Sequence, residues 1–158
     1  MSLRKTAEGL RLCRRPIREI ELLRKKEYRW ADLVLKPGDN PLEGITGELF
    51  EIRAEVEPGR ADKFGFDIRA IQVLYDIGRQ KVYCGGKVGP LEPVNNKVKF
   101  HLLIDRASLE VFANDGLLSM SSCMLPADDN KSIGVFCMGG QVKMDSLTVW
   151  ELNSIWDR

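Results

Sequence analysis

The sequence predicts an all-β fold in which two antiparallel sheets pack face to face as a β-sandwich of the jelly-roll or concanavalin-like kind, with one short N-terminal helix. Three observations predict it. Apolar and polar residues alternate with a period of two from residue 30 onward. Turn signals separate the alternating runs about every eight to twelve residues. The 158 residues are 44% hydrophobic and 30% charged, the composition of one soluble domain. A closed barrel is the alternative architecture.

The clearest strand covers residues 48–57, where Phe50, Ile52 and Val56 alternate with charged residues before a Pro-Gly turn. Such a strand has one buried and one wet face. Asn114, Asp115 and Gly116 carry the Asp-Gly signal of a type I′ hairpin turn. Including residues 48–57, the sequence predicts roughly nine or ten strands. The other runs that we expect to be strands are residues 64–69, 71–75, 81–84, 98–104, 109–113, 117–124, 132–138 and 142–152.

The first 29 residues differ in kind from the rest. Residues 9–14 alternate as a short strand, and Pro16 then stands at a typical first helical position. Ile17, Ile20 and Leu23 follow at three-residue steps, which predicts a short amphipathic helix. The basic run at residues 24–26 suits the C-terminal end of that helix. A helix with one apolar stripe needs another surface to pack on.

Charge is distributed unevenly, although the formal net charge is only +1. Residues 1–29 hold ten Lys and Arg against four Asp and Glu, and the remainder is net acidic. This pattern favours a basic segment that lies against an acidic body or a neighbouring domain. The near-zero total gives no reason to expect a nucleic-acid partner, and no apolar run is long enough to cross a membrane.

No residue pattern indicates catalysis, a metal or a cofactor. The cysteines lack the close spacing of zinc ligands, and His101, the single histidine, lies in an apolar strand. Asp105 and Glu110 flank a tight turn, which does not supply the pocket that a general acid needs. We therefore interpret both carboxylates as turn residues. Trp30, Tyr75 and Tyr83 are candidates for stacking on sugar rings, although core packing also explains strand aromatics.

Residues 99–116 resemble the C-terminal β-sandwich of glycoside hydrolase family 32. The pattern is an apolar strand followed by Asp-Arg-x-Ser, x-Glu-Val-Phe and x-Asn-Asp-Gly. Residues 142–156 resemble the closing strand of that domain, and residues 9–20 resemble its junction with the catalytic domain. The residues of the turns in this signature are Asp105, Arg106, Ser108, Glu110, Asn114, Asp115 and Gly116.

The resemblance implies that the catalytic carboxylates lie in a separate five-bladed β-propeller, in Asn-Asp-Pro-Asn-Gly, Arg-Asp-Pro and Glu-Cys motifs. None of these motifs occurs here, so the resemblance transfers no catalytic residue. We expect residues 1–29 to form a junction segment from the propeller and residues 30–158 to form the sandwich module. The expected function is non-catalytic: the module stabilises the propeller of a fructan- or sucrose-cleaving enzyme. The expected domain-packing residues are Leu10, Leu12, Ile17, Ile20 and Leu23.

Two alternatives remain open at this point. A stand-alone carbohydrate-binding module is compatible with the sandwich pattern and the three aromatic candidates, and its ligand would be a fructan or another carbohydrate. A homodimer is compatible with uncovered sheet edges, which pair readily.

Overall fold

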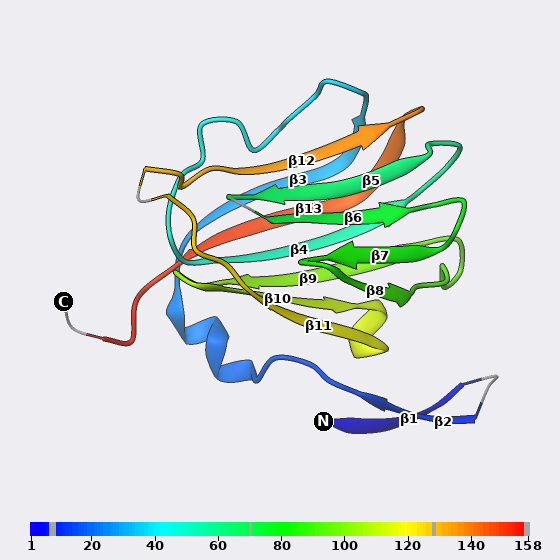
Figure 1. Cartoon of the computed structure of the whole chain (residues 1–158), viewed down its shortest axis with the longest axis horizontal. Helices are drawn as coiled ribbons and strands as arrows, with labels where there is room; N and C mark the ends of the chain where they lie inside the picture. The colour runs from blue at the N-terminus through cyan, green and yellow to red at the C-terminus, as the bar shows by residue number, and fades with distance from the viewer. Residues whose placement is uncertain (7–8, 70, 128, 157–158) are drawn as a thin grey trace.

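Two antiparallel sheets stack face to face in the computed structural model of the chain (Figure 1), in which residues 1–6, 9–69, 71–127 and 129–156 are described. The larger sheet has six strands in the order β11-β10-β9-β4-β13-β3, and the smaller has five in the order β12-β5-β6-β7-β8. The two sheets are separate and each has its own edge strands. The predicted β-sandwich is therefore confirmed, and the closed barrel is excluded.

All strands of the two sheets except β3 and β8 follow the expected runs closely. In the six-stranded sheet they are β3 Arg24–Leu35, β4 Phe50–Glu57, β9 Val98–Ile104, β10 Ser108–Ala113, β11 Leu118–Cys123 and β13 Val142–Leu152. In the five-stranded sheet they are β5 Lys63–Ile68, β6 Ile71–Asp76, β7 Lys81–Cys84, β8 Lys87–Pro90 and β12 Ile133–Met138. A separate hairpin pairs β1 Ser2–Thr6 with β2 Gly9–Cys13.

The core lies between the two sheets because each strand turns its apolar side inward. At its centre, the rings of Phe64, Phe66 and Tyr75 gather around Phe100, with centroids 5.7 to 6.2 Å from that ring. Edge-to-face packing of this kind suits the quadrupoles of aromatic rings. These four side chains tie β5 and β6 of one sheet to β9 of the other.

Three local expectations differ from the structure. The helix is a six-residue 3-10 helix, η1, at Arg18–Leu23, and the basic run at residues 24–26 begins β3. That run is extended because β13 pairs with it, which overrides a local helical preference. The boundary expected between residues 29 and 30 consequently falls inside β3. The strands β1, β3 and β8 are not among the runs that the sequence predicts.

The Asn-Asp-Gly hairpin is present but is built differently from a two-residue turn. Ala113 pairs with Leu118, so four residues form the loop, and η2 covers Asn114–Gly116. Within the described part of the chain, no helix has the length and apolar composition of a membrane-spanning segment.

Candidate functional site

The N-terminal hairpin stands off the sandwich, as Figure 1 shows. Leu3 pairs with Leu12 and Lys5 with Leu10, so three leucines share one face of the hairpin. Leu3, Leu10 and Leu12 are 70%, 72% and 50% exposed. A cluster of exposed leucines on a two-stranded ribbon indicates a contact surface for another protein surface.

The opposite face of the hairpin turns towards the sandwich. Arg4 and Arg11 pair across the two strands, and both line a hollow whose other wall is the loop at residues 90–94. The leucine face is therefore directed away from the body to which the hairpin is attached. We call the ribbon formed by β1 and β2 the junction hairpin, and its three leucines form the leucine face.

The Asn-Asp-Gly turn holds the chain that leads out of the junction hairpin. The backbone N–H of Arg14 donates to the carbonyl of Gly116 at 3.0 Å. The Arg15 side chain donates through Nε to the carbonyl of Asp115 at 2.8 Å. This turn, distant in sequence, therefore determines where the junction hairpin leaves the sandwich.

The geometry of this turn requires its particular residues. Asn114, Asp115 and Gly116 all have positive φ, at 45°, 62° and 86°, a region that Asn, Asp and Gly tolerate best. The buried Asn114 amide accepts from the N–H of Lys99 at 2.9 Å and donates to the carbonyl of Glu92 at 2.7 Å. These two bonds fasten the turn to the ends of neighbouring strands.

Gly116 is also required for space. A Cβ at this position would lie 2.0 Å from the carbonyl oxygen of Arg14. Any larger residue would push the two segments apart, so the glycine allows the close approach of backbone to backbone.

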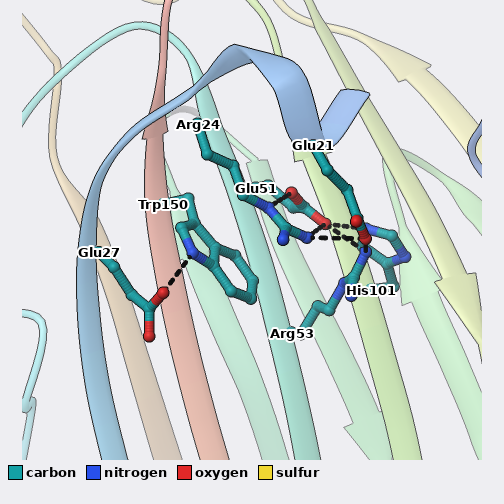
Figure 2. Close-up of polar contacts among 7 residues, drawn as sticks. All are labelled: Glu21, Arg24, Glu27, Glu51, Arg53, His101 and Trp150. Carbon is teal, nitrogen blue, oxygen red and sulfur yellow. Dashed lines mark hydrogen bonds and ion pairs between the residues drawn. The ribbon is translucent and has the colours of Figure 1, made fainter. Parts of the chain in front are cut away.

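The second attachment is a charged cluster beneath η1 on the outer face of the six-stranded sheet. Figure 2 shows Glu51 at its centre, between Arg24 and His101, with Arg53 beside them. Arg24 Nε donates to Glu51 Oε2 at 2.8 Å, Arg53 Nη2 lies 2.8 Å from Oε1, and His101 Nε2 also lies 2.8 Å from Oε1. His101 Nε2 is buried and, despite this short distance, forms no hydrogen bond with the carboxylate. Glu21 of η1 reaches the same cluster, with Oε1 2.9 Å from Arg53 Nη2.

Glu51 has no exposed surface, although its strand was expected to turn its charged residues to water. Burial by itself raises the pKa of this carboxyl, but the contacts with His101 and Arg24 and the charge of Arg53 outweigh burial and lower the pKa to about 2. Glu51 is therefore a buried anion at neutral pH, and it binds the start of β3 to the middle of the sheet.

Trp150 extends this cluster. The Arg24 guanidinium stacks 3.9 Å from the centroid of its indole ring, and Nε1 donates to Glu27 Oε2 at 2.9 Å. The sequence contained no signal for this cluster, because its members come from η1, β3, β4, β9 and β13 and meet only through strand register.

The expected packing residues fall into two groups. Leu10 and Leu12 lie on the junction hairpin, and Ile17 is 69% exposed. Ile20 and Leu23 are partly buried and line an apolar groove of about 310 Å³, together with Leu103, Leu152 and Trp156 among others.

Four residues of the signature, Asp105, Arg106, Ser108 and Glu110, also line that groove. Asp105 accepts the N–H of Arg106 at 2.7 Å, and its own N–H donates to the carbonyl of Ser108 at 2.9 Å. Arg106 pairs with Glu48 at 2.9 Å and not with either of the carboxylates that flank the turn. Glu110 lies on the outer face of β10. These contacts describe a turn stabilised by its own backbone and by a neighbouring loop.

The three aromatic candidates do not come together. Trp30 is partly buried against the core, from β3. Tyr75 is fully buried, and its hydroxyl donates to the carbonyl of Leu91 at 3.1 Å, so it has no ring face open to a sugar. Tyr83 lies on the outer face of the five-stranded sheet, partly exposed. Tyr75 is therefore excluded as a residue that could stack on a sugar ring.

Comparison with known proteins assigns the family. The profile described as "Glycosyl hydrolases family 32 C terminal" matches residues 19–151. A levanase from Bacillus subtilis (strain 168) is 33% identical over 180 aligned positions, which cover 99% of this chain and 27% of that protein. A raffinose invertase from Escherichia coli is 27% identical, with 90% of this chain and 32% of that protein covered.

Solved structures show the same fold. An exo-inulinase from Aspergillus awamori superimposes with a TM-score of 0.82 at 21% identity, over 99% of this chain and 35% of that one. The two layers and the preceding segment define a β-sandwich domain of the kind found in glycoside hydrolases. The chain belongs to glycosyl hydrolase family 32, as its C-terminal domain, and spans about a quarter to a third of the length of these relatives.

Proposed function

We propose that this chain is a non-catalytic module that packs on the catalytic domain of a fructan- or sucrose-cleaving hydrolase and stabilises it. The observation that carries the proposal is the junction hairpin, whose three leucines are exposed and directed away from the sandwich. Burying such a face contributes about 25 cal/mol for each Å² of apolar surface removed from water. The occupant that fits is the catalytic domain, which the family resemblance describes as a five-bladed propeller.

The attachment of the junction hairpin supports the same function. A module that stabilises its neighbour must hold the connecting chain in one direction, because a loose tether transmits little of the contact energy. Arg14 and Arg15 are held by the Asn-Asp-Gly turn, and η1 is held by the Glu51 cluster. The basic segment therefore lies on the acidic body at two separate points.

The proposal is tested by supplying a catalytic domain. The B. subtilis levanase, prepared without the segment that matches this chain, is mixed with the chain, and the melting temperature and co-elution are measured. We expect a complex and a higher melting temperature. The Leu10→Ser/Leu12→Ser variant should lose both effects, whereas Leu125→Ser, which alters a 93% exposed leucine in the loop after β11, should retain them.

Hydrolysis gives a second measurement. The purified chain alone should not release fructose from levan, inulin or sucrose. Specific turnover by the chain, or an unchanged melting temperature in the mixture together with no co-elution, would contradict the proposed role.

A further inference from the structure

The outer face of the five-stranded sheet carries one continuous row of apolar and aromatic side chains. Phe136 of β12 pairs with Gly65 of β5, Gly65 with Leu74 of β6, Leu74 with Tyr83 of β7, and Tyr83 with Val88 of β8. All of their sequence neighbours except Lys87 are buried, so the four side chains of this set point outward. We call this set the platform row. It crosses every strand of the sheet.

Glycine at the second position of the row is what lets an aromatic ring cross the sheet. A Cβ on Gly65 would lie close to the carbonyl oxygen of Val73 and 2.7 Å from Cζ of Phe136, so the backbone of β6 and the end of that ring both approach this position. Glycine in the middle of a strand weakens it unless another group approaches closely. Here the close groups are the carbonyl of Val73 in β6 and the aromatic ring of Phe136 on the outer side of the sheet.

Polar residues of both signs border the platform row. On one side Gln72 donates through Nε2 to Asp67 Oδ1 at 2.8 Å. On the other side Lys63, Asp76 and Lys81 pair across β5, β6 and β7. Arg79 and Lys87 also lie close to Tyr83, so the borders offer hydrogen-bond donors and acceptors of both signs, with more basic than acidic groups.

One end of the row is hollowed. Tyr83, Gln72 and Lys87 line a hollow of about 380 Å³ together with the turn at residues 85–86, which consists of two glycines. Because these glycines carry no side chains, the ring of Tyr83 has open space beside it on this side.

The size and chemistry of the platform row identify its occupant. Five strands spaced about 4.8 Å apart give a stripe about 20 Å long, and the spacing along a strand makes it about 7 Å wide. Its area of about 140 Å² is far below the roughly 800 Å² per partner that a stable protein interface buries. An apolar stripe bordered by hydrogen-bond donors and acceptors suits a chain of sugar rings, which present apolar C–H faces and many hydroxyl groups.

We propose that the platform row binds a neutral oligosaccharide, and that Tyr83 and Phe136 stack on its rings. The choice of fructan as the ligand rests on the proposed function. The assignment of the platform row as a sugar-binding site does not depend on that function. The platform row lies on the outer face of the five-stranded sheet, and the charged cluster that holds η1 lies on the outer face of the other sheet, so the two are on opposite sides of the sandwich.

The experiment titrates the 158-residue chain with levan- and inulin-derived oligosaccharides by calorimetry, and maps amide chemical shifts in the ¹⁵N-labelled protein. We expect weak saturable binding, with shift changes concentrated in β5 to β8. Tyr83→Ala should weaken binding about tenfold, as the loss of one aromatic stacking contact would. The matched control is Phe112→Ala, which removes a partly buried aromatic ring from the outer face of the other sheet and should leave binding unchanged. Circular dichroism and melting temperature verify that each variant is folded.

Three results would overturn the proposal. The first is the absence of heat and of shift changes at millimolar oligosaccharide. The second is binding that Phe112→Ala abolishes and Tyr83→Ala does not. The third is sedimentation of the chain as a dimer that Tyr83→Ala dissociates, because the row would then be an interface between copies. Fructan binding without any effect on a catalytic domain would support the platform row and contradict only the proposed function.

Discussion

Replacement of the buried Glu51 by glutamine should destabilise the sandwich strongly and in a pH-dependent way. The substitution keeps the shape of the side chain but removes the charge that Arg24, Arg53 and His101 surround. A folded-state pKa of about 2, against an ordinary value of 4.5, corresponds to about 3 kcal/mol of stabilisation of the charged form. For a domain of this length, we expect the melting temperature to fall by about 6 to 12 °C.

The sign of the pH dependence follows from the direction of the shift. The pKa of Glu51 is lower in the folded than in the unfolded chain, so its contribution is complete above about pH 4.5 and is lost as the pH falls towards about 2. The difference in unfolding free energy between the two proteins should therefore be constant near neutral pH. It should shrink steadily in acid.

Urea unfolding, followed by tryptophan fluorescence at a series of pH values, measures this difference. Glu110→Gln is the matched control, because Glu110 and Glu51 both pair with Leu103 in one row of the same sheet face. We expect that control to change stability by less than about 0.5 kcal/mol. Equal stability of Glu51→Gln and the unaltered chain at neutral pH, or a difference that does not change in acid, would refute the assignment of Glu51 as a buried, stabilising anion.

Two further predictions concern the junction and the thiols. Gly116→Ala should lower the free energy of unfolding by roughly 2–4 kcal/mol and Gly86→Ala by about 1 kcal/mol, as measured by urea titration. Both glycines have positive φ, but only a Cβ at Gly116 would meet the backbone of Arg14. Equal losses of stability would show that the turn does not hold the junction. Under native conditions an aromatic disulfide reagent should label Cys123 rapidly and the other thiols slowly, with all four labelled in denaturant. A Cys123→Ser variant that still shows a fast thiol would contradict that assignment. The buried thiols are Cys13, Cys84 and Cys137, and burial raises the pKa of the latter two.

Much of the sandwich could be predicted because strand identity is a local property here. Each run such as residues 50–56 alternates apolar and charged residues, and this alternation already states which side is buried. The Asn-Asp-Gly turn was recognisable for the same reason, since few residues tolerate positive φ. Local patterns failed at residues 24–26, where a basic run that suits a helix end is drawn into β3 by pairing with β13.

The candidate sites were predictable only in part. Leu10 and Leu12 could be selected from their alternation in the sequence, whereas Leu3 and the pairing of β1 with β2 could not. Tyr75 and Tyr83 look alike in sequence, yet one is sealed in the core and the other lies on an outer face. The difference depends on strand register, since a shift of one residue exchanges the two faces of a strand.

The sequence by itself therefore determined the class of fold, the family and the presence of an unusual N-terminal segment, because these depend on periodicity, turn residues and motifs that are contiguous in the chain. The tertiary structure alone decided that Glu51 is a buried anion held by Arg53 of its own strand and by groups from two other strands, and that Phe136, Leu74 and Tyr83 form one row. Both arrangements join residues far apart in the sequence, and only the order and register of the strands bring such residues within contact distance.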